Sequence, residues 1–325
     1  MELKQLYDAF ENKYRQEVKP YIEKNLPRDS FSEPIYHILD NFQLRRFRSA
    51  FPLIFAEEYK TDKSKVLPIA AASELIFTIA LVQDDIIDQD NKRGNIPASH
   101  TKFGTEICLA SCDYVHSLIS RMLNSLRSMN ISRRTLDSVY DSFIDANRRL
   151  YQSFMEEKLE AGNFNLPIER IIEIYKDKTI QGTTSLFTST LVCIEDEETA
   201  ELIKEYSYDL AIAGQIKNDI YDATCYMQNR GYSDLDNGYI TYVIRKLLDS
   251  VSEEEKRDLM NKINCKEDNK IIEALRKRGT IQSCIADCER YVASAISRID
   301  GKFSSNLEDI LVSWADGNRR FSRQI

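Results

Sequence analysis

A run of apolar residues from Val66 to Val82 is the feature of this sequence that most restricts its fold. The run reads VLPIAAASELIFTIALV, and Glu74 is its only charged residue. A helix that is apolar on every side is stable only where other helices surround it. The run is shorter and more interrupted than a membrane span of about 20 residues. We therefore expect a core helix in the middle of a bundle.

The rest of the chain favours the same all-α architecture. Only 10 Gly and 7 Pro interrupt its 325 residues, and apolar residues recur at helical spacing almost throughout. No repeat, linker or change of composition marks a boundary, so we expect a single helical domain over residues 1–325. The expected helices cover residues 2–25, 32–59, 64–90, 104–127, 133–161, 167–194, 196–228, 237–250, 268–297 and 304–315.

Charge and composition exclude several functional classes. The net charge of -8 argues against nucleic-acid binding, although local cations or a metal ion can still create an anion site. The N-terminus lacks the pattern of a signal peptide, and we expect a cytoplasmic protein without a transmembrane segment. The pairs Cys108–Cys112 and Cys284–Cys288 lack the other ligands of a zinc site, so we expect free buried thiols.

The apolar run leads directly into a cluster of carboxylates. Asp84 and Asp88 lie one helical turn apart on one face, with Asp85 beside them. Like charges at this spacing repel, so a cluster at the end of a buried helix requires neutralisation. Hard oxygen ligands that leave room for water and phosphates suit Mg²⁺. An acidic, solvated helix end is the alternative interpretation.

A second cluster favours the metal site. Asn218, Asp219 and Asp222 repeat the same spacing after the apolar segment Tyr208–Ile216. Two ligand clusters on separate core helices could clamp Mg²⁺ ions around a diphosphate across a cavity. The ions would polarise the leaving group, and a dry cavity would hold the resulting carbocation. The pattern therefore indicates metal-assisted cleavage of a carbon–oxygen bond.

These clusters and their surroundings resemble the motifs of the trans-prenyl (polyprenyl) diphosphate synthase family. DDIIDQDNKRGNIPASHTKFG, from Asp84, is similar to the first aspartate-rich motif, and GQIKNDIYD, from Gly214, to the second. Three further segments resemble family segments in the same order: LRRFRSAFPLIFAEEY at 44–59, YKDKTIQGTTSLF at 175–187 and SDLDNGYITYVI at 233–244. The resemblance implies an isoprenoid synthase fold, an antiparallel bundle around a central cavity, usually as a homodimer.

The resemblance also assigns roles to individual residues. The metal ligands would be Asp84, Asp85, Asp88, Asn218, Asp219 and Asp222, with three Mg²⁺ ions around bound diphosphate. Gln215 would lie near the reacting carbons, and with Asp84, Asp85, Asp88 and Asp219 it completes the catalytic set. The substrate-binding residues would be Arg45, Arg48, Lys92, Arg93, Lys178 and Lys217. Lys92 would contact the allylic diphosphate, whereas Arg45, Arg48 and Arg93 would hold isopentenyl diphosphate.

The chain departs from the family pattern mainly among the cations around the diphosphates. Phe77 stands where the family often has His or Gln. Gly182 stands where the family has a basic residue, and a gapped alignment places Lys178 at that position instead. Two expected lysines correspond to Asn229 and Tyr239. Gly182 suggests a helix break or the close approach of another segment, and the break resembles that of class I terpene cyclases; a glycine that is simply tolerated within a helix is the alternative. An arginine cluster that could replace the lost cations comprises Arg319, Arg320 and Arg323; a solvated tail is the alternative.

The leading interpretation is a prenyltransferase that ionises an allylic diphosphate and condenses it with isopentenyl diphosphate. A terpene cyclase, favoured by Phe77 and Gly182, and prenyl transfer to another acceptor remain alternatives on the same fold. A partner subunit without activity is a third class, against which the two preserved clusters argue. The small Ala80, one turn before Asp84, predicts a product of C20 or longer.

Overall fold

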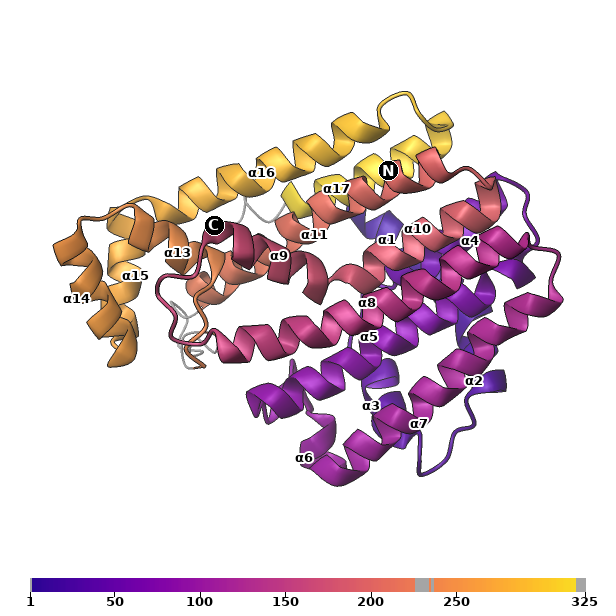
Figure 1. Ribbon diagram of the computed structural model, residues 1–325, viewed down its shortest axis with the longest axis horizontal. Coiled ribbons are helices and arrows are strands. Elements are labelled where there is room, and N and C mark those ends of the chain that lie inside the picture. The colour runs from indigo at the N-terminus through magenta and orange to yellow at the C-terminus, as the bar shows by residue number, and fades with distance from the viewer. Residues whose placement is uncertain (1, 226–233, 235–236, 320–325) are drawn as a thin grey trace. The chain divides into compact units, whose positions relative to one another are not determined.

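The computed structural model describes residues 2–225, 234 and 237–319 (Figure 1). The helices are α1 (Leu3–Lys13), α2 (Lys19–Asn25), α3 (Glu33–Asn41), α4 (Phe47–Glu58), α5 (Leu67–Asp88), α6 (Ser99–Phe103), α7 (Thr105–Asn124), α8 (Arg133–Leu159), α9 (Ile168–Lys178), α10 (Ile180–Ile194), α11 (Glu197–Cys225), α13 (Tyr242–Asp249), α14 (Glu253–Asn264), α15 (Asp268–Lys277), α16 (Thr280–Ile299) and α17 (Ser305–Arg319). The all-α fold is therefore confirmed.

Shorter elements complete the described part of the chain. A π-helical segment, η1 (Tyr14–Val18), joins α1 to α2, and two 3₁₀ turns are η2 (Lys63–Lys65) and η3 (Ser125–Ser128). Strands β1 (Lys92–Arg93) and β2 (Ile96–Pro97) form an antiparallel hairpin with Lys92 opposite Pro97.

The chain divides into two compact units. Unit 1 comprises Met1–Arg148, Gln181–Lys204 and Ser304–Ile310, and unit 2 comprises Arg149–Ile180, Glu205–Phe303 and Leu311–Ile325. In unit 2, α13 packs against α9 and α16, and α15 packs against α14 and α16. The single domain expected from the sequence stays a prediction.

Helix α5 is the core of unit 1, as its sequence indicates. It packs against α2, α3, α4, α6 and α7, and Figure 1 shows it running beside α7. The segment Lys63–Asp88 is long and apolar enough to cross a membrane, but 78% of its most apolar window is buried inside the protein. That burial is the pattern of a core helix. The prediction of a core helix is confirmed.

The single charge within the apolar run of this core helix has a buried partner. Glu74 is 1% exposed, and its Oε1 accepts a hydrogen bond of 2.6 Å from the guanidinium of Arg46. Arg46 also donates to the carbonyl of Leu39 at 2.7 Å and stacks 3.8 Å from the ring centroid of Tyr14. These contacts hold Arg46 in the left-handed conformation, at φ 50°, which is strained for a residue with a side chain.

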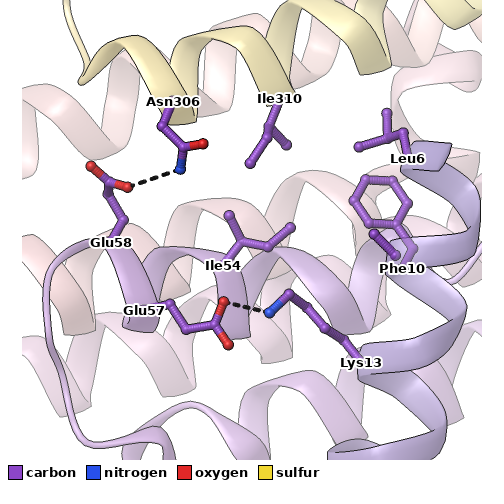
Figure 2. Close-up of a pocket in the computed structure, with 9 residues that line it drawn as sticks. Leu6, Phe10, Lys13, Ile54, Glu57, Glu58, Asn306 and Ile310 are labelled. Carbon is purple, nitrogen blue, oxygen red and sulfur yellow. Dashed lines mark hydrogen bonds and ion pairs between the residues drawn. The ribbon is translucent and has the colours of Figure 1, made fainter. Parts of the chain in front are cut away.

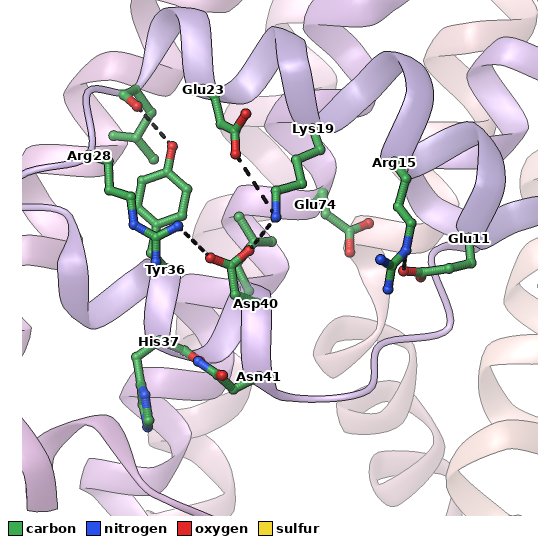
Figure 3. A network of polar contacts seen from close by, with 12 residues as sticks. Glu11, Arg15, Lys19, Glu23, Arg28, Tyr36, His37, Asp40, Asn41 and Glu74 are labelled. Atoms are coloured by element: carbon green, nitrogen blue, oxygen red, sulfur yellow. Dashed lines mark hydrogen bonds and ion pairs between the residues drawn. The ribbon is translucent and has the colours of Figure 1, made fainter.

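A second polar network fastens α2 to α3. Lys19 and Arg28 converge on Asp40, at 2.9 Å and 2.7 Å, as Figure 3 shows. Burial alone would raise the pKa of Asp40, but the two cations hold that pKa below its usual value. Because α3 also packs on α5, this network helps to position α3 against the core helix.

Several helix boundaries predicted from periodicity are wrong. Residues 32–59 form two helices, because the chain turns at Arg46 to bring its guanidinium to Glu74. Residues 268–297 also form two helices, separated by Gly279 at φ 64°. Residues 167–194 are divided at Thr179 into α9 and α10, and α14 was not predicted. The buried thiols of Cys108, Cys112, Cys284 and Cys288 are free, as expected.

Replacing Glu74 with Leu should lower the free energy of unfolding by about 3–5 kcal/mol, because the buried Arg46 would lose its hydrogen-bonded counter-ion and keep only the more distant Glu11, at 3.5 Å. Adding Arg46→Met should recover part of that loss, because the buried charge is then removed. Urea unfolding of the wild type, both single variants and the double variant measures the coupling. Glu57→Gln, which removes more exposed ion pairs with Lys13 and Lys63, should cost less than about 1 kcal/mol. A Glu74→Leu protein as stable as the wild type would contradict this account.

Candidate functional site

In unit 1 the first carboxylate cluster is joined to an arginine on the following hairpin. Arg93 donates from Nε to Asp85 at 2.9 Å, and its terminal nitrogen lies 2.6 Å from Asp85 and 3.1 Å from Asp84. The turn of the hairpin uses Gly94 at φ 59°, where a Cβ would lie 3.2 Å from the ring of Phe42. The hairpin thus carries a cation back to the end of α5.

The position of these carboxylates is electrostatically unfavourable without further cations. Asp84, Asp85 and Asp88 occupy the C-terminal turn of α5, where the helix dipole is negative and the helix has no basic residue. Burial raises the pKa of Asp85 above its usual value even though Arg93 lowers it. The second carboxylate oxygen of Asp85, Oδ2, is buried and has no hydrogen-bond partner among the described residues. The site therefore has an oxygen ligand available for a cation.

The other predicted cations of unit 1 differ in exposure. Lys92 is exposed on β1, and Arg45 is exposed with its guanidinium 5.9 Å from the ring of Tyr7. Arg48 is half-buried, 3.5 Å from the ring centroid of Phe77 and 4.3 Å from that of Phe47. Burial lowers the pKa of Arg48 to about 10, so the side chain remains charged at neutral pH. Of these cations, Arg48 alone lies against two aromatic rings.

In unit 2 the second cluster is organised around neutral donors. Asp219 is 4% exposed, and its Oδ2 accepts hydrogen bonds from the hydroxyl of Tyr175 at 2.5 Å and the backbone N–H of Tyr242 at 3.0 Å. Burial, followed by repulsion from Asp234, raises the pKa of Asp219 well above its usual value. Asn218 is exposed and Asp222 is half-buried on the same helix, α11. The cluster thus presents one buried and two accessible oxygen ligands.

The remaining predicted residues of unit 2 lie near this cluster in sequence or on α9. Gln215 is half-buried on α11, and Lys217 donates to the carbonyl of Gly317 at 3.2 Å. Lys178, the last residue of α9, forms an ion pair of 2.6 Å with Glu157. The predicted roles of these residues in substrate binding stay predictions.

The structure also shows the surroundings of two residues, Gly182 and Tyr239, that stand where the family pattern has a basic side chain. Gly182 lies inside α10, and the helix break comes three residues earlier, at Thr179. A Cβ at Gly182 would lie 3.1 Å from the ring of Phe47, so this glycine permits a close approach. Tyr239 is 4% exposed, and the ammonium group of Lys158 lies 5.1 Å from its ring centroid. Asn229, Arg320 and Arg323 lie outside the described residues.

Both clusters suit a hard divalent cation in their ligand chemistry. Their side chains are carboxylates and an amide, which are ligands that Mg²⁺ accepts. Within residues 2–225, 234 and 237–319, no three His, Cys, Asp or Glu side chains converge into a ready-made metal cage. Mg²⁺ usually binds one or two carboxylates together with water and substrate phosphates, so the residues fit an ion that arrives with its substrate.

A separate cavity of about 250 Å³ lies in unit 1 and contains none of the predicted site residues (Figure 2). Its apolar walls come from Leu6, Phe10, Ile54 and Ile310. Polar contacts cross its edge, including one of 3.4 Å from Asn306 to Glu58. The aspartate clusters therefore remain the candidate functional residues.

Sequence reasoning missed the residues that hold the predicted ones in place. Tyr175 and Arg46 belong to segments that drew attention, but neither received a role. The solitary charge of Glu74 in an apolar helix was a signal that a buried partner existed. No local pattern indicated that Tyr175 meets Asp219, because 44 residues separate them.

Comparison with known proteins agrees with these motifs. The family model described as polyprenyl synthetase matches residues 29–277. A geranylgeranyl diphosphate synthase of Sulfolobus acidocaldarius is 25% identical over 296 residues, which cover 87% of each chain. A geranylgeranyl pyrophosphate synthetase structure from Pyrococcus horikoshii Ot3 matches with a TM-score of 0.86 and 20% identity over 97% of this chain and 98% of its own.

A further structure contains ligands. It is a geranylgeranyl pyrophosphate synthase from Corynebacterium glutamicum, crystallised with isoprenyl diphosphate and magnesium. The match has a TM-score of 0.80 and 15% identity, and it covers 99% of this chain and 100% of the other. The two structural matches show that this chain has the isoprenoid synthase fold.

Tyr175→Phe should lower the free energy of unfolding by about 1–3 kcal/mol, because it removes the hydroxyl that donates to the buried Asp219. Urea unfolding in metal-free buffer measures the change. Tyr7→Phe is the control and should shift stability by less than about 0.5 kcal/mol, because no hydrogen bond of its hydroxyl is present among the described residues. Equal stability of the Tyr175→Phe variant and the wild type would show that this hydrogen bond does not support the cluster.

Proposed function

Because the chain belongs to the polyprenyl synthetase family and is a prenyltransferase, we propose that it is a magnesium-dependent synthase that joins an allylic diphosphate to isopentenyl diphosphate. The observation that carries the proposal is the carboxylate cluster at the end of α5, with its unpartnered buried oxygen on Asp85. The magnesium in the related Corynebacterium glutamicum structure supports the choice of ion.

The first cluster would bind the allylic substrate. Asp84, Asp85 and Asp88 would hold Mg²⁺, with the second cluster supplying Asp219, Asp222 and the neutral Asn218 to further ions. Bound Mg²⁺ would draw negative charge from the diphosphate, so that the allylic carbon–oxygen bond breaks more easily. The exposed Lys92 would contact the same diphosphate. Gln215 would lie near the reacting carbons.

The second substrate would use the basic residues near α4. Arg45 and Arg48 would bind the diphosphate of isopentenyl diphosphate through their forked N–H donors. Arg93 would contribute only after its carboxylate partners turn to Mg²⁺, since it pairs with Asp84 and Asp85 here. The double bond of isopentenyl diphosphate would attack the allylic cation, and the departing diphosphate would accept the released proton.

The oligomeric state proposed for the chain is a homodimer, as the family resemblance implies. Helix α7 exposes Ile107 and Leu109, which are 53% and 44% accessible, and Phe31 beside Tyr114 is 64% accessible. A contiguous exposed apolar patch is typical of a surface that binds another chain, and these residues would contribute to such a patch. We also propose a cytoplasmic location, where its isoprenoid substrates would be available to a globular enzyme.

Product analysis tests the proposed reaction. Purified protein with Mg²⁺ and C10, C15 or C20 allylic diphosphate should form a longer diphosphate only when isopentenyl diphosphate is added. Mass spectrometry identifies the product. A hydrocarbon or alcohol from one allylic substrate alone would establish a cyclase, and no product in any tube would favour another acceptor or an inactive subunit.

A matched pair of variants checks the metal assignment in the same assay. Asp84→Ala should reduce turnover by about 100-fold or more while the protein keeps its helical content. Replacing a residue that only supports a metal ligand already lowers metal affinity or activity about 10–100-fold, and Asp84 would be a ligand itself. Asp309→Ala, at an exposed acid on α17, should retain wild-type turnover. Full activity of Asp84→Ala would refute the assignment.

Product length is expected to depend on Ala80. This residue is 4% exposed, lies one helical turn before Asp84, and its small side chain leaves room for a chain of C20 or longer. Ala80→Phe should therefore shift the products to shorter chains in the same mass spectrometric assay. Ala293→Phe, on the exposed face of α16, should leave the product distribution unchanged. An unchanged distribution for Ala80→Phe would refute the assignment of Ala80 to the cavity wall.

A further inference from the structure

Two departures from the family pattern meet at one side chain in unit 1. The ring of Phe77 lies 3.5 Å from the guanidinium carbon of Arg48, and the ring of Phe47 lies 4.3 Å from it. Gly182 supports this arrangement, because a Cβ there would come within 3.1 Å of Phe47 and 3.9 Å of the Nε atom of Arg48. We call Phe47 and Phe77 the aromatic clamp of Arg48.

We propose that Phe77 and Gly182 are positioning residues that orient Arg48 through the aromatic clamp, so that one guanidinium holds the acceptor diphosphate where the family uses several polar groups. The inference rests on the proposed function, because it concerns the second substrate of that reaction. Neither residue touches the substrate in this account. Phe77 packs directly on Arg48, and Gly182 makes space for Phe47.

The clamp leaves the donors of Arg48 available for a ligand. Its Nε has no hydrogen-bond partner among the described residues. Glu74, which lies on α5 as Phe77 does, acts on Arg48 through its charge, but its ion pair of 2.6 Å is with Arg46. An aromatic face attracts a guanidinium without using its N–H groups, which project from the edge of the planar group. A phosphate can then accept those hydrogen bonds.

The backbone of Arg48 is held as firmly as its side chain. Ser185 on α10 donates a hydrogen bond of 2.5 Å to the carbonyl oxygen of Arg48. Gly182 lies one turn earlier on the same helix, so α10 contacts both the backbone of Arg48 and the ring of Phe47. A larger side chain at position 182 would displace the ring by a few tenths of an ångström, and the guanidinium with it. Gly182 and Phe77 therefore act on the same group.

The decisive experiment is calorimetric titration of the full chain with isopentenyl diphosphate in the absence of an allylic substrate. Phe77→Leu keeps an apolar side chain but removes the aromatic face, and it should weaken binding about tenfold. Gly182→Ala should weaken binding in the same direction. The double variant should lose less than the product of the two single effects, because both act through Arg48.

The matched control is Phe187→Leu. Phe187 is a half-buried aromatic residue on α10 with the ammonium group of Lys204 5.1 Å from its ring, but it lies outside the clamp. This variant should bind isopentenyl diphosphate as the wild type does. Steady-state kinetics should agree: Phe77→Leu raises KM for isopentenyl diphosphate about tenfold, while KM for the allylic substrate and kcat stay within about twofold.

The outcomes separate the clamp from the proposed function. Wild-type affinity in Phe77→Leu, or an equal rise in both KM values, overturns the clamp even when the wild type elongates normally. Weakened binding in Phe77→Leu but not in Phe187→Leu supports the clamp. A wild type that binds isopentenyl diphosphate but never elongates an allylic substrate overturns the proposed reaction and leaves the titration as a valid test of the clamp.

Discussion

The burial of α5 is the constraint on which the organisation of unit 1 depends. A helix with apolar residues on all sides must be surrounded, and α2, α3, α4, α6 and α7 pack around it. Its internal charge, Glu74, can be buried only with a counter-ion, and Arg46 supplies one from the turn before α4. The strained backbone of Arg46 is thus explained by the position that its guanidinium must occupy to pair with Glu74 of α5. The same contact sets the start of α4, where Arg45 and Arg48 lie.

The two carboxylate clusters have the same spacing but different environments. At the end of α5, Asp84 and Asp85 share a charged partner, Arg93, and one oxygen of Asp85 has no hydrogen-bond partner in the described part of the chain. On α11, Asp219 is held by a hydroxyl and a backbone N–H, which orient it without neutralising it. In both clusters burial raises the pKa of one carboxyl group, Asp85 or Asp219, which disfavours its negative charge. A cation that binds together with its diphosphate substrate would compensate that charge.

Aromatic residues stand at two positions where the family pattern has a polar or basic side chain: Phe77 replaces His or Gln, and Tyr239 replaces Lys. Phe77 contacts Arg48, and Tyr239 contacts Lys158, so in each case a cation from a different helix lies against the ring. An aromatic face holds a cation without consuming its hydrogen-bond donors. At each of these positions the ring therefore lies against a cation supplied by another part of the same unit.

The sequence by itself determined the all-α fold, the core position of α5 and the placement of each carboxylate cluster on one helix face. These properties are local, because helical periodicity decides which residues share a face. It did not determine the break at Arg46, the partner of Arg93, the contact of Tyr175 with Asp219 or the aromatic clamp. Each of these joins residues on different elements, up to 44 positions apart for Tyr175 and Asp219. An apolar or charged face in a sequence shows that a partner is required, but only the packed structure decides which side chain reaches it.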